Sequence, residues 1–212
     1  NGAISDYSKA IELDPNYQIA HYNRGYIKTN AEDYEGAIAD YTKVIGLNPD
    51  YPDSYIRRAY AKYKLKDFKG AISDYSKAIE LDPANVLQVA ESFNNRGNVK
   101  KKIEDYEGAI ADYTKAIELD PDSALAYTNR ANVKNDLGDY NGAISDYSKA
   151  IELDPNYGLA YHNRAYAKNG IEDYEGAIAD YTKAIEFDYD YPYCYVNRGN
   201  AKTNAEDYEG AI

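Results

Sequence analysis

Proline recurs at a spacing of 34 residues along most of the chain. Pro15, Pro49 and Pro83 follow this spacing, and so do Pro121 and Pro155. The step from Pro83 to Pro121 is 38 residues long, which indicates an insertion of four residues, placed at 86–89 ("VLQV"). A fixed period of this length is typical of proteins that copy one small supersecondary unit along the chain.

Each period contains two helical patterns separated by a short turn. Residues 127–137 form the first pattern. In the second, residues 141–153, small and apolar residues such as Ala143 and Tyr147 recur at steps of three and four, which predicts a helix with one buried face. Pro155 ends this helix, because proline lacks an N–H and clashes with the preceding turn. The unit is therefore helix, turn, helix, stop.

A single helix pair of this size cannot bury its apolar face, so neighbouring pairs must stack into an all-α solenoid. One tyrosine per second helix supplies the large core side chain: Tyr41, Tyr75, Tyr113, Tyr147 and Tyr181. Small residues are expected to leave room where helices cross: Ala20, Gly36, Ala37, Gly70, Ala71, Gly108, Ala109, Gly142, Ala143, Gly176 and Ala177.

These features together resemble the tetratricopeptide repeat (TPR) family. The resemblance is carried by the 34-residue period, the Gly–Ala pair before an "I-x-D-Y" run, and the "KAIELDP" ending, and it covers essentially the whole chain. It implies a right-handed superhelical solenoid of antiparallel helix pairs. It also implies a non-enzymatic interaction scaffold, whose first helices line a concave groove that holds a peptide or protein segment.

The repeat frame predicts a single TPR-like solenoid over residues 1–212. The frame consists of a lone second helix at 1–17, repeats at 18–51, 52–85, 90–123, 124–157 and 158–191, and a partial repeat at 192–212. The insertion at 86–89 has two interpretations. Four residues are about one helical turn, so it lengthens a first helix, or it presents an extra apolar contact to a partner.

The first helices depart from the family pattern in their charged residues. Arginine stands where the family usually has leucine: Arg24, Arg58, Arg96, Arg130, Arg164 and Arg198. Lysine follows four residues later, and each second helix carries an aspartate just before its core tyrosine: Asp40, Asp74, Asp112, Asp146 and Asp180. The arginines either form bidentate pairs with these aspartates or make a basic groove for acidic peptides. The completeness of both columns favours pairing.

The sequence contains no catalytic constellation, so no enzyme activity, cofactor or metal is expected. His21 and His162 lie in distant repeats, so they are not expected to converge, and each is interpreted as a substitute for the Tyr or Asn of its place rather than as a ligand. The net charge of −12 disfavours nucleic acid as a partner. No apolar run is long enough to predict membrane insertion. Cys194 is the single cysteine, which favours a reducing, cytoplasmic compartment, while an extracellular location stays open.

A column of amides runs along the first helices, one place before each arginine. Its members are Asn23, Asn95, Asn129, Asn163 and Asn197, and Arg57 interrupts it. Asparagine both donates and accepts, so such a ladder can hold the backbone of a peptide. Three places further on, the same surface is extended by Tyr26, Tyr60, Asn98, Asn132, Tyr166 and Asn200. Equally, the asparagines order the solenoid by bonding neighbouring helices, and the two roles are compatible.

The two ends of the sequence carry nearly the same four-residue pattern. Asn1–Ile4 ("NGAI") occupies the same repeat positions as Glu209–Ile212 ("EGAI"), so the chain opens and stops within second helices. This pattern indicates either a window cut from a longer TPR array or end-to-end contact between copies of the chain. Such a head-to-tail contact does not close and builds a filament, which is the alternative function.

Overall fold

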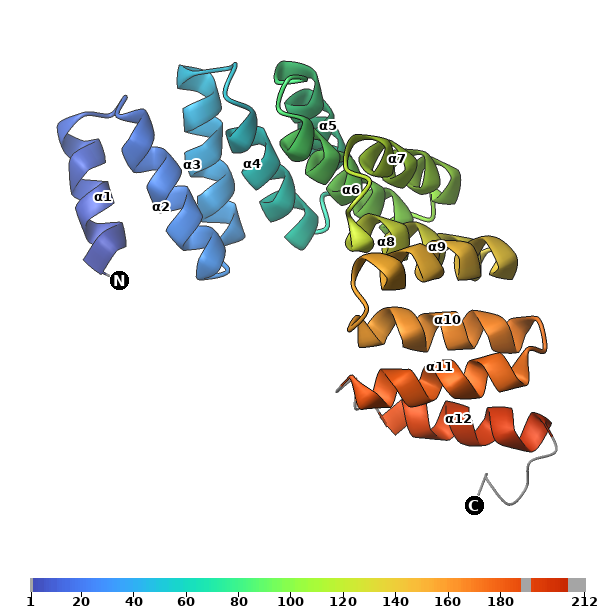
Figure 1. Cartoon of the computed structure of the whole chain (residues 1–212). Helices are drawn as coiled ribbons and strands as arrows, with labels where there is room; N and C mark the ends of the chain where they lie inside the picture. The colour runs from blue at the N-terminus through green and yellow to red at the C-terminus, as the bar shows by residue number, and fades with distance from the viewer. Residues whose placement is uncertain (1, 188–191, 206–212) are drawn as a thin grey trace. The chain divides into compact units, whose positions relative to one another are not determined.

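The computed structural model describes residues 2–187 and 192–205 of the chain (Figure 1). The regular elements of these residues are all helices: α1 (Gly2–Leu13), α2 (Gln18–Asn30), α3 (Tyr34–Leu47), α4 (Pro52–Lys64), α5 (Phe68–Leu81), α6 (Val86–Lys102), α7 (Tyr106–Leu119), α8 (Ala124–Asp136), α9 (Tyr140–Leu153), α10 (Gly158–Gly170), α11 (Tyr174–Glu186) and α12 (Pro192–Asn204). The predicted all-α class of stacked helix pairs is confirmed for this part of the chain.

The chain divides into two compact units, 1–108 and 109–212, with the boundary inside α7. Within each unit, neighbouring helices in the sequence pack against one another, as α1 to α6 do in the first unit and α8 to α12 in the second. The even-numbered helices are the first helices of the repeats and the odd-numbered helices are the second helices. The predicted repeat boundaries of a single solenoid stay a prediction. The second helix expected near the C-terminal end, at 206–212, lies outside the described residues.

The second helices begin at an aspartate. Asp139 is the N-cap of α9, and its carboxylate accepts a hydrogen bond from the backbone N–H of Gly142 at 3.0 Å. A carboxylate at this place also interacts favourably with the positive end of the helix dipole. A Cβ on Gly142 would lie 2.1 Å from this carboxylate. The expectation that this glycine makes room for a neighbouring helix is therefore wrong, because it accommodates the N-cap of its own helix.

The core consists of tyrosines set among alanines. Tyr41 and Tyr181 are fully buried, and Tyr75 and Tyr147 are at most 3% exposed. In the second unit, Tyr147 packs with Ala131, which lies on a first helix, and with Ala143 on its own helix. The predicted roles of the tyrosines and alanines in close packing are thus confirmed.

The insertion at 86–89 adds one turn to the start of α6. This helix has 17 residues, whereas the other first helices have 13. Its N-cap, Asn85, accepts a hydrogen bond from the backbone N–H of Gln88. The phase of the helix is kept, and the interpretation as a lengthened first helix is confirmed. Val86 and Leu87 in the added turn are exposed. None of the described helices has the length and apolar character that crossing a membrane requires.

Candidate peptide-binding face

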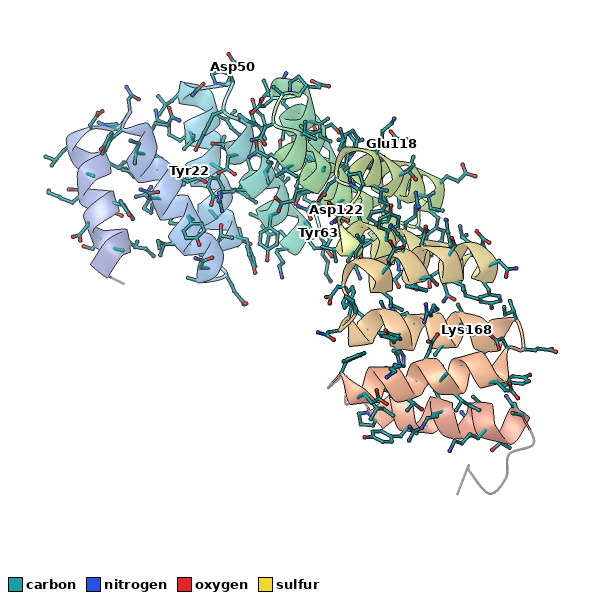
Figure 2. All side chains as sticks on the ribbon, in the orientation of Figure 1. Tyr22, Asp50, Tyr63, Glu118, Asp122 and Lys168 are labelled. Carbon is teal, nitrogen blue, oxygen red and sulfur yellow. The ribbon has the colours of Figure 1, made fainter. Side chains whose placement is uncertain are left out.

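The first and second helices of a repeat are joined by a cluster of one aspartate and two cations. Asp146 of α9 is 5% exposed. Its two carboxylate oxygens accept hydrogen bonds from Arg130 Nε at 2.9 Å and Nη2 at 2.7 Å, and Lys134 Nζ donates at 2.8 Å. Equivalent clusters form around Asp40, Asp74 and Asp180; in the last, Lys168 of α10 is the second cation (Figure 2).

Each of these arginines also connects neighbouring repeats. The Nη1 atom of Arg130 donates to Thr114 on the preceding second helix at 3.1 Å, and Arg164 reaches Ser148 in the same way. The guanidinium of Arg130 lies 5.7 Å from the ring centre of Tyr127, which occupies the family's usual aromatic place. One arginine thus bonds the second helices before and after its own helix, and it lies against a ring of its own helix.

The aspartates of the second helices pair with arginines and lysines of the first helices and offset their positive charge. Burial alone would raise the pKa of Asp40, but the hydrogen bonds from Arg24 and Lys28 outweigh it and hold the pKa below its usual range. The carboxylate is therefore charged and matched by cations that face the second helix. The interpretation of internal pairing is confirmed for these clusters, and a basic groove for acidic peptides loses the charges on which it depended.

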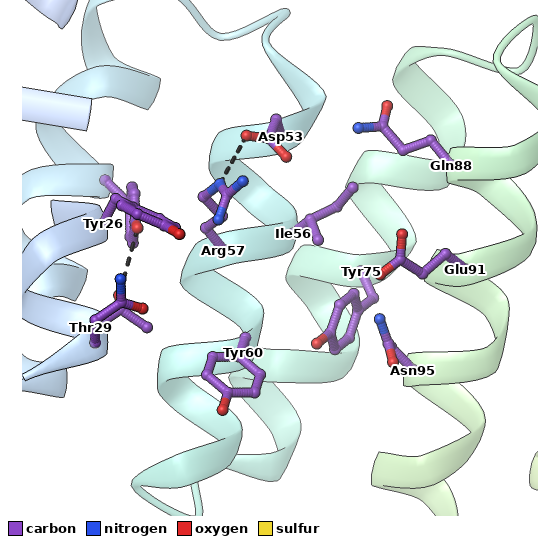
Figure 3. A pocket seen from close by; sticks show the side chains of 12 residues that line it. Tyr26, Thr29, Asp53, Ile56, Arg57, Tyr60, Tyr75, Gln88, Glu91 and Asn95 are labelled. Atoms are coloured by element: carbon purple, nitrogen blue, oxygen red, sulfur yellow. Dashed lines mark hydrogen bonds and ion pairs between the residues drawn. The ribbon is translucent and has the colours of Figure 1, made fainter. Parts of the chain in front are cut away.

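A pocket of about 350 Å³ opens on the face formed by α2, α4 and α6 in the first unit (Figure 3). It is named the α2–α4–α6 pocket below. Among its walls are the predicted site residues Tyr26, Tyr60 and Asn95. Arg57, which interrupts the amide column, also lines it, and Gln88 comes from the added turn of α6. The two departures from the repeat pattern in this unit therefore meet at one place.

Arg57 is held in place by contacts on several sides. Its Nε donates to Asp53, one turn earlier on α4, at 2.8 Å, and Tyr22 donates its hydroxyl to the same carboxylate. The guanidinium lies 5.0 Å from the ring centre of Tyr26. Burial and the negative charge of Asp53 raise the pKa of Tyr22, so its hydroxyl stays protonated.

A second pocket, of about 230 Å³, lies on the face formed by α10 and α12 in the second unit. The predicted site residues Tyr166, Asn197 and Asn200 line it, together with Asn169. The side-chain oxygen of Asn169 is buried and accepts no hydrogen bond within the described residues, while its amide nitrogen donates to Tyr181. One amide in the wall of this pocket therefore keeps a buried oxygen without a partner among the described residues.

Other members of the amide column bond within the protein. Asn163 donates its amide to the side-chain oxygen of Asn132 at 3.1 Å, and the hydroxyl of Tyr147 donates to the same oxygen at 2.6 Å. Asn23, Asn98 and Asn129 are partly buried and line neither pocket. Six of the eleven predicted residues thus lie in two pockets, and a further pair orders neighbouring first helices.

Models of the tetratricopeptide repeat match residues 19–51, 52–85, 124–157 and 159–191, and a TPR repeat model matches residues 1–31 and 97–135. The chain belongs to the tetratricopeptide repeat family. No curated protein matches it. The expected family is therefore confirmed from the sequence, and the helix pairs described above are TPR units.

Solved structures share this TPR fold. MamA is 25% identical, with a TM-score of 0.71, and the match covers 80% of this chain and 91% of that chain. YrrB, described as a TPR protein with an unusual peptide-binding site, is 23% identical with a TM-score of 0.70, covering 93% and 97%. Pseudomonas aeruginosa pilF is 19% identical with a TM-score of 0.76, covering 92% and 86%.

Sequence reasoning missed several residues that line the pockets. Arg57 was visible only as the one break in the amide column, and that break marks the α2–α4–α6 pocket. Glu91 and Tyr75 also line this pocket, yet neither stands out in the repeat pattern. The signal that could have found them is the insertion, because an added turn changes which side chains face the preceding repeat.

His162 of α10 is partly buried beside Cys194 of α12, with 3.0 Å between its Nδ1 and the sulfur. Burial lowers the pKa of this imidazole. An unfolded histidine binds a proton below about pH 6.5, whereas the folded one resists it. Stability is therefore expected to fall as the pH drops through this value, by at most about 1.4 kcal/mol per pH unit.

Urea unfolding of the wild type and of His162→Asn between pH 7 and pH 5 measures this effect. The variant lacks the titrating group, so its stability should depend less on pH. His21 is present in both proteins, and its contribution cancels in the difference. Equal slopes for the two proteins would exclude His162 as the origin of the acid sensitivity.

Proposed function

We propose that this TPR protein is a non-enzymatic scaffold that binds an extended peptide or protein segment along its first helices. The observation that carries the proposal is the concentration of exposed aromatic and amide side chains at the two pockets on these helices. Tyr26, Tyr60 and Tyr166 are 43%, 42% and 52% exposed, although tyrosine at the other repeated position is buried. Tyrosine is one of the side chains that are enriched at protein interfaces.

The polar groups at these pockets suit a peptide backbone. Asn95 in the first unit and Asn197 and Asn200 in the second offer both donors and acceptors. Aromatic rings next to such amides supply apolar contact area, which a partner side chain would cover.

An array of short random-sequence peptides probed with the whole chain tests the proposal. Tyr60→Ala and Tyr166→Ala are expected to weaken binding of the selected peptides roughly tenfold each, because tyrosine truncation at the centre of an interface often costs more than 1 kcal/mol. Tyr17→Ala is the matched control, since Tyr17 is 46% exposed but lines neither pocket.

Two outcomes would contradict the proposal. One is that no peptide binds the wild type above background. The other is that Tyr17→Ala weakens binding as much as the two pocket variants, since the loss would then not arise at the pockets. Circular dichroism of each variant separates lost binding from lost helix.

The head-to-tail filament predicted from the sequence is the alternative. It stays a prediction that light scattering can test, because a strictly monomeric species would contradict it.

A further inference from the structure

The α2–α4–α6 pocket carries an uneven charge. The charged residues that line it are Asp53, Arg57 and Glu91. Asp53 and Arg57 form an ion pair with 2.8 Å between the carboxylate and the guanidinium. In the part of the chain that the structure describes, no ion pair or hydrogen bond engages the carboxylate of Glu91. The pocket therefore holds one negative charge in excess, on the wall formed by α6.

The hydroxyl of a buried tyrosine also lacks a partner among the described residues at this pocket. Tyr75 is 3% exposed and lines the pocket (Figure 3). The hydroxyls of the equivalent Tyr147 and Tyr181 bond an asparagine of a first helix. No hydrogen bond of Tyr75 to another described residue is formed. Burial and the negative charge of Glu91 raise the pKa of Tyr75, which keeps its hydroxyl neutral.

The remaining walls suit an aliphatic stem. Ile56 and Tyr60 of α4 line the pocket opposite Glu91 of α6 (Figure 3). Tyr26 already contacts Arg57, and Tyr60 already contacts Lys64, whose Nζ lies 5.5 Å from the ring centre. A further cation in this pocket is therefore attracted to the carboxylate of Glu91 rather than to the rings.

We propose that the α2–α4–α6 pocket binds a basic side chain, lysine or arginine, of the peptide that lies on the first helices. The inference rests on the proposed function and names the partner's chemistry at one of its pockets. The aliphatic stem packs against Ile56 and Tyr60, the cation pairs with Glu91, and the hydroxyl of Tyr75 accepts a hydrogen bond from it. Arg58 and Lys62 of α4 are engaged by Asp74, so these two cations do not repel such a peptide.

A peptide array with one position varied tests this inference on the whole chain. Peptides selected by the wild type are expected to require lysine or arginine at one position, and replacing that residue by glutamine should weaken binding about tenfold, because a hydrogen bond to a charged group is lost. With Glu91→Gln this preference should disappear, and with Glu91→Lys it should shift to an acidic residue. Glu80→Gln, an exposed glutamate on α5 outside the pocket, is the matched control.

The Tyr75→Phe variant tests the hydroxyl. It should weaken binding of the basic peptides while leaving the melting temperature unchanged, because the hydroxyl has no partner within the described residues. Peptides that bind the wild type with no basic preference, or a preference that survives Glu91→Gln, would overturn the inference and leave the proposed function standing. If no peptide binds at all, both fall.

Discussion

Replacing Asp146 by alanine is expected to lower the free energy of unfolding by about 3–5 kcal/mol, because removing one partner of a buried ion pair leaves uncompensated charge. Two cations, Arg130 and Lys134, would then face a buried methyl group at a site where the aspartate is 5% exposed. For a chain of this size each kcal/mol shifts the melting temperature by about 2–4 °C. Scanning calorimetry should therefore show a drop on the order of 10 °C.

Two further variants make this prediction specific. Arg130→Ala should cost less than Asp146→Ala, because Lys134 still pairs with the aspartate. Glu152→Ala removes an exposed partner of Lys149, whose side chain is 38% exposed, and should change stability by less than about 1 kcal/mol. Equal, small shifts for Asp146→Ala and Glu152→Ala would show that the cluster does not stabilise the helix pair.

The features that repeat were predictable from the sequence. The 34-residue period, the helix pairs and the buried tyrosines follow from residues that recur at fixed places. The pairing of Arg130 with Asp146 was predictable for the same reason, since the same two columns recur 16 residues apart. The insertion could be read as a helical turn because four residues preserve the phase of a helix.

The features that occur once were not predictable in the same way. The α2–α4–α6 pocket draws its walls from helices of three successive repeats. Its charge depends on Arg57 and Glu91, which belong to no recurring column of the sequence. The hydroxyl of Tyr75 has no partner among the described residues because Tyr60 and Tyr63 occupy the repeat positions near it. In other repeats the equivalent positions hold Asn132, which bonds Tyr147, and Asn169, which bonds Tyr181. A repeat pattern describes the shared frame, whereas a specific site depends on departures from it.

The role of the glycines also depended on atomic detail. Near the start of the second helices the sequence places a glycine directly before a buried alanine, as at Gly142 and Ala143, and small size suggested close helix packing for both. Only the contacts distinguish them, because Ala143 is fully buried while Gly142 lies beneath the carboxylate of Asp139. Capping of the second helix and packing of its core are thus performed by adjacent residues.

Replacing Tyr147 by alanine is expected to lower the free energy of unfolding by about 3–5 kcal/mol, as for other large aromatic residues in cores. Tyr147 is 1% exposed, and it packs in a cluster whose other buried members are Ala131, Ala143 and Ala167. Alanines cannot extend into the space that the ring leaves, so the cavity persists and the helices on either side lose their largest shared contact. Urea unfolding measures the loss.

The phenylalanine variants separate the ring from its hydroxyl. Tyr147→Phe keeps the ring but removes the 2.6 Å hydrogen bond to Asn132, and should cost about 1 kcal/mol. Tyr75→Phe removes a hydroxyl that bonds no described residue, so its stability should match the wild type or exceed it slightly. If Tyr75→Phe cost as much as Tyr147→Phe, the hydroxyl of Tyr75 would have a partner inside the protein. In that case a ligand would have to compete with this internal partner for the hydroxyl of Tyr75.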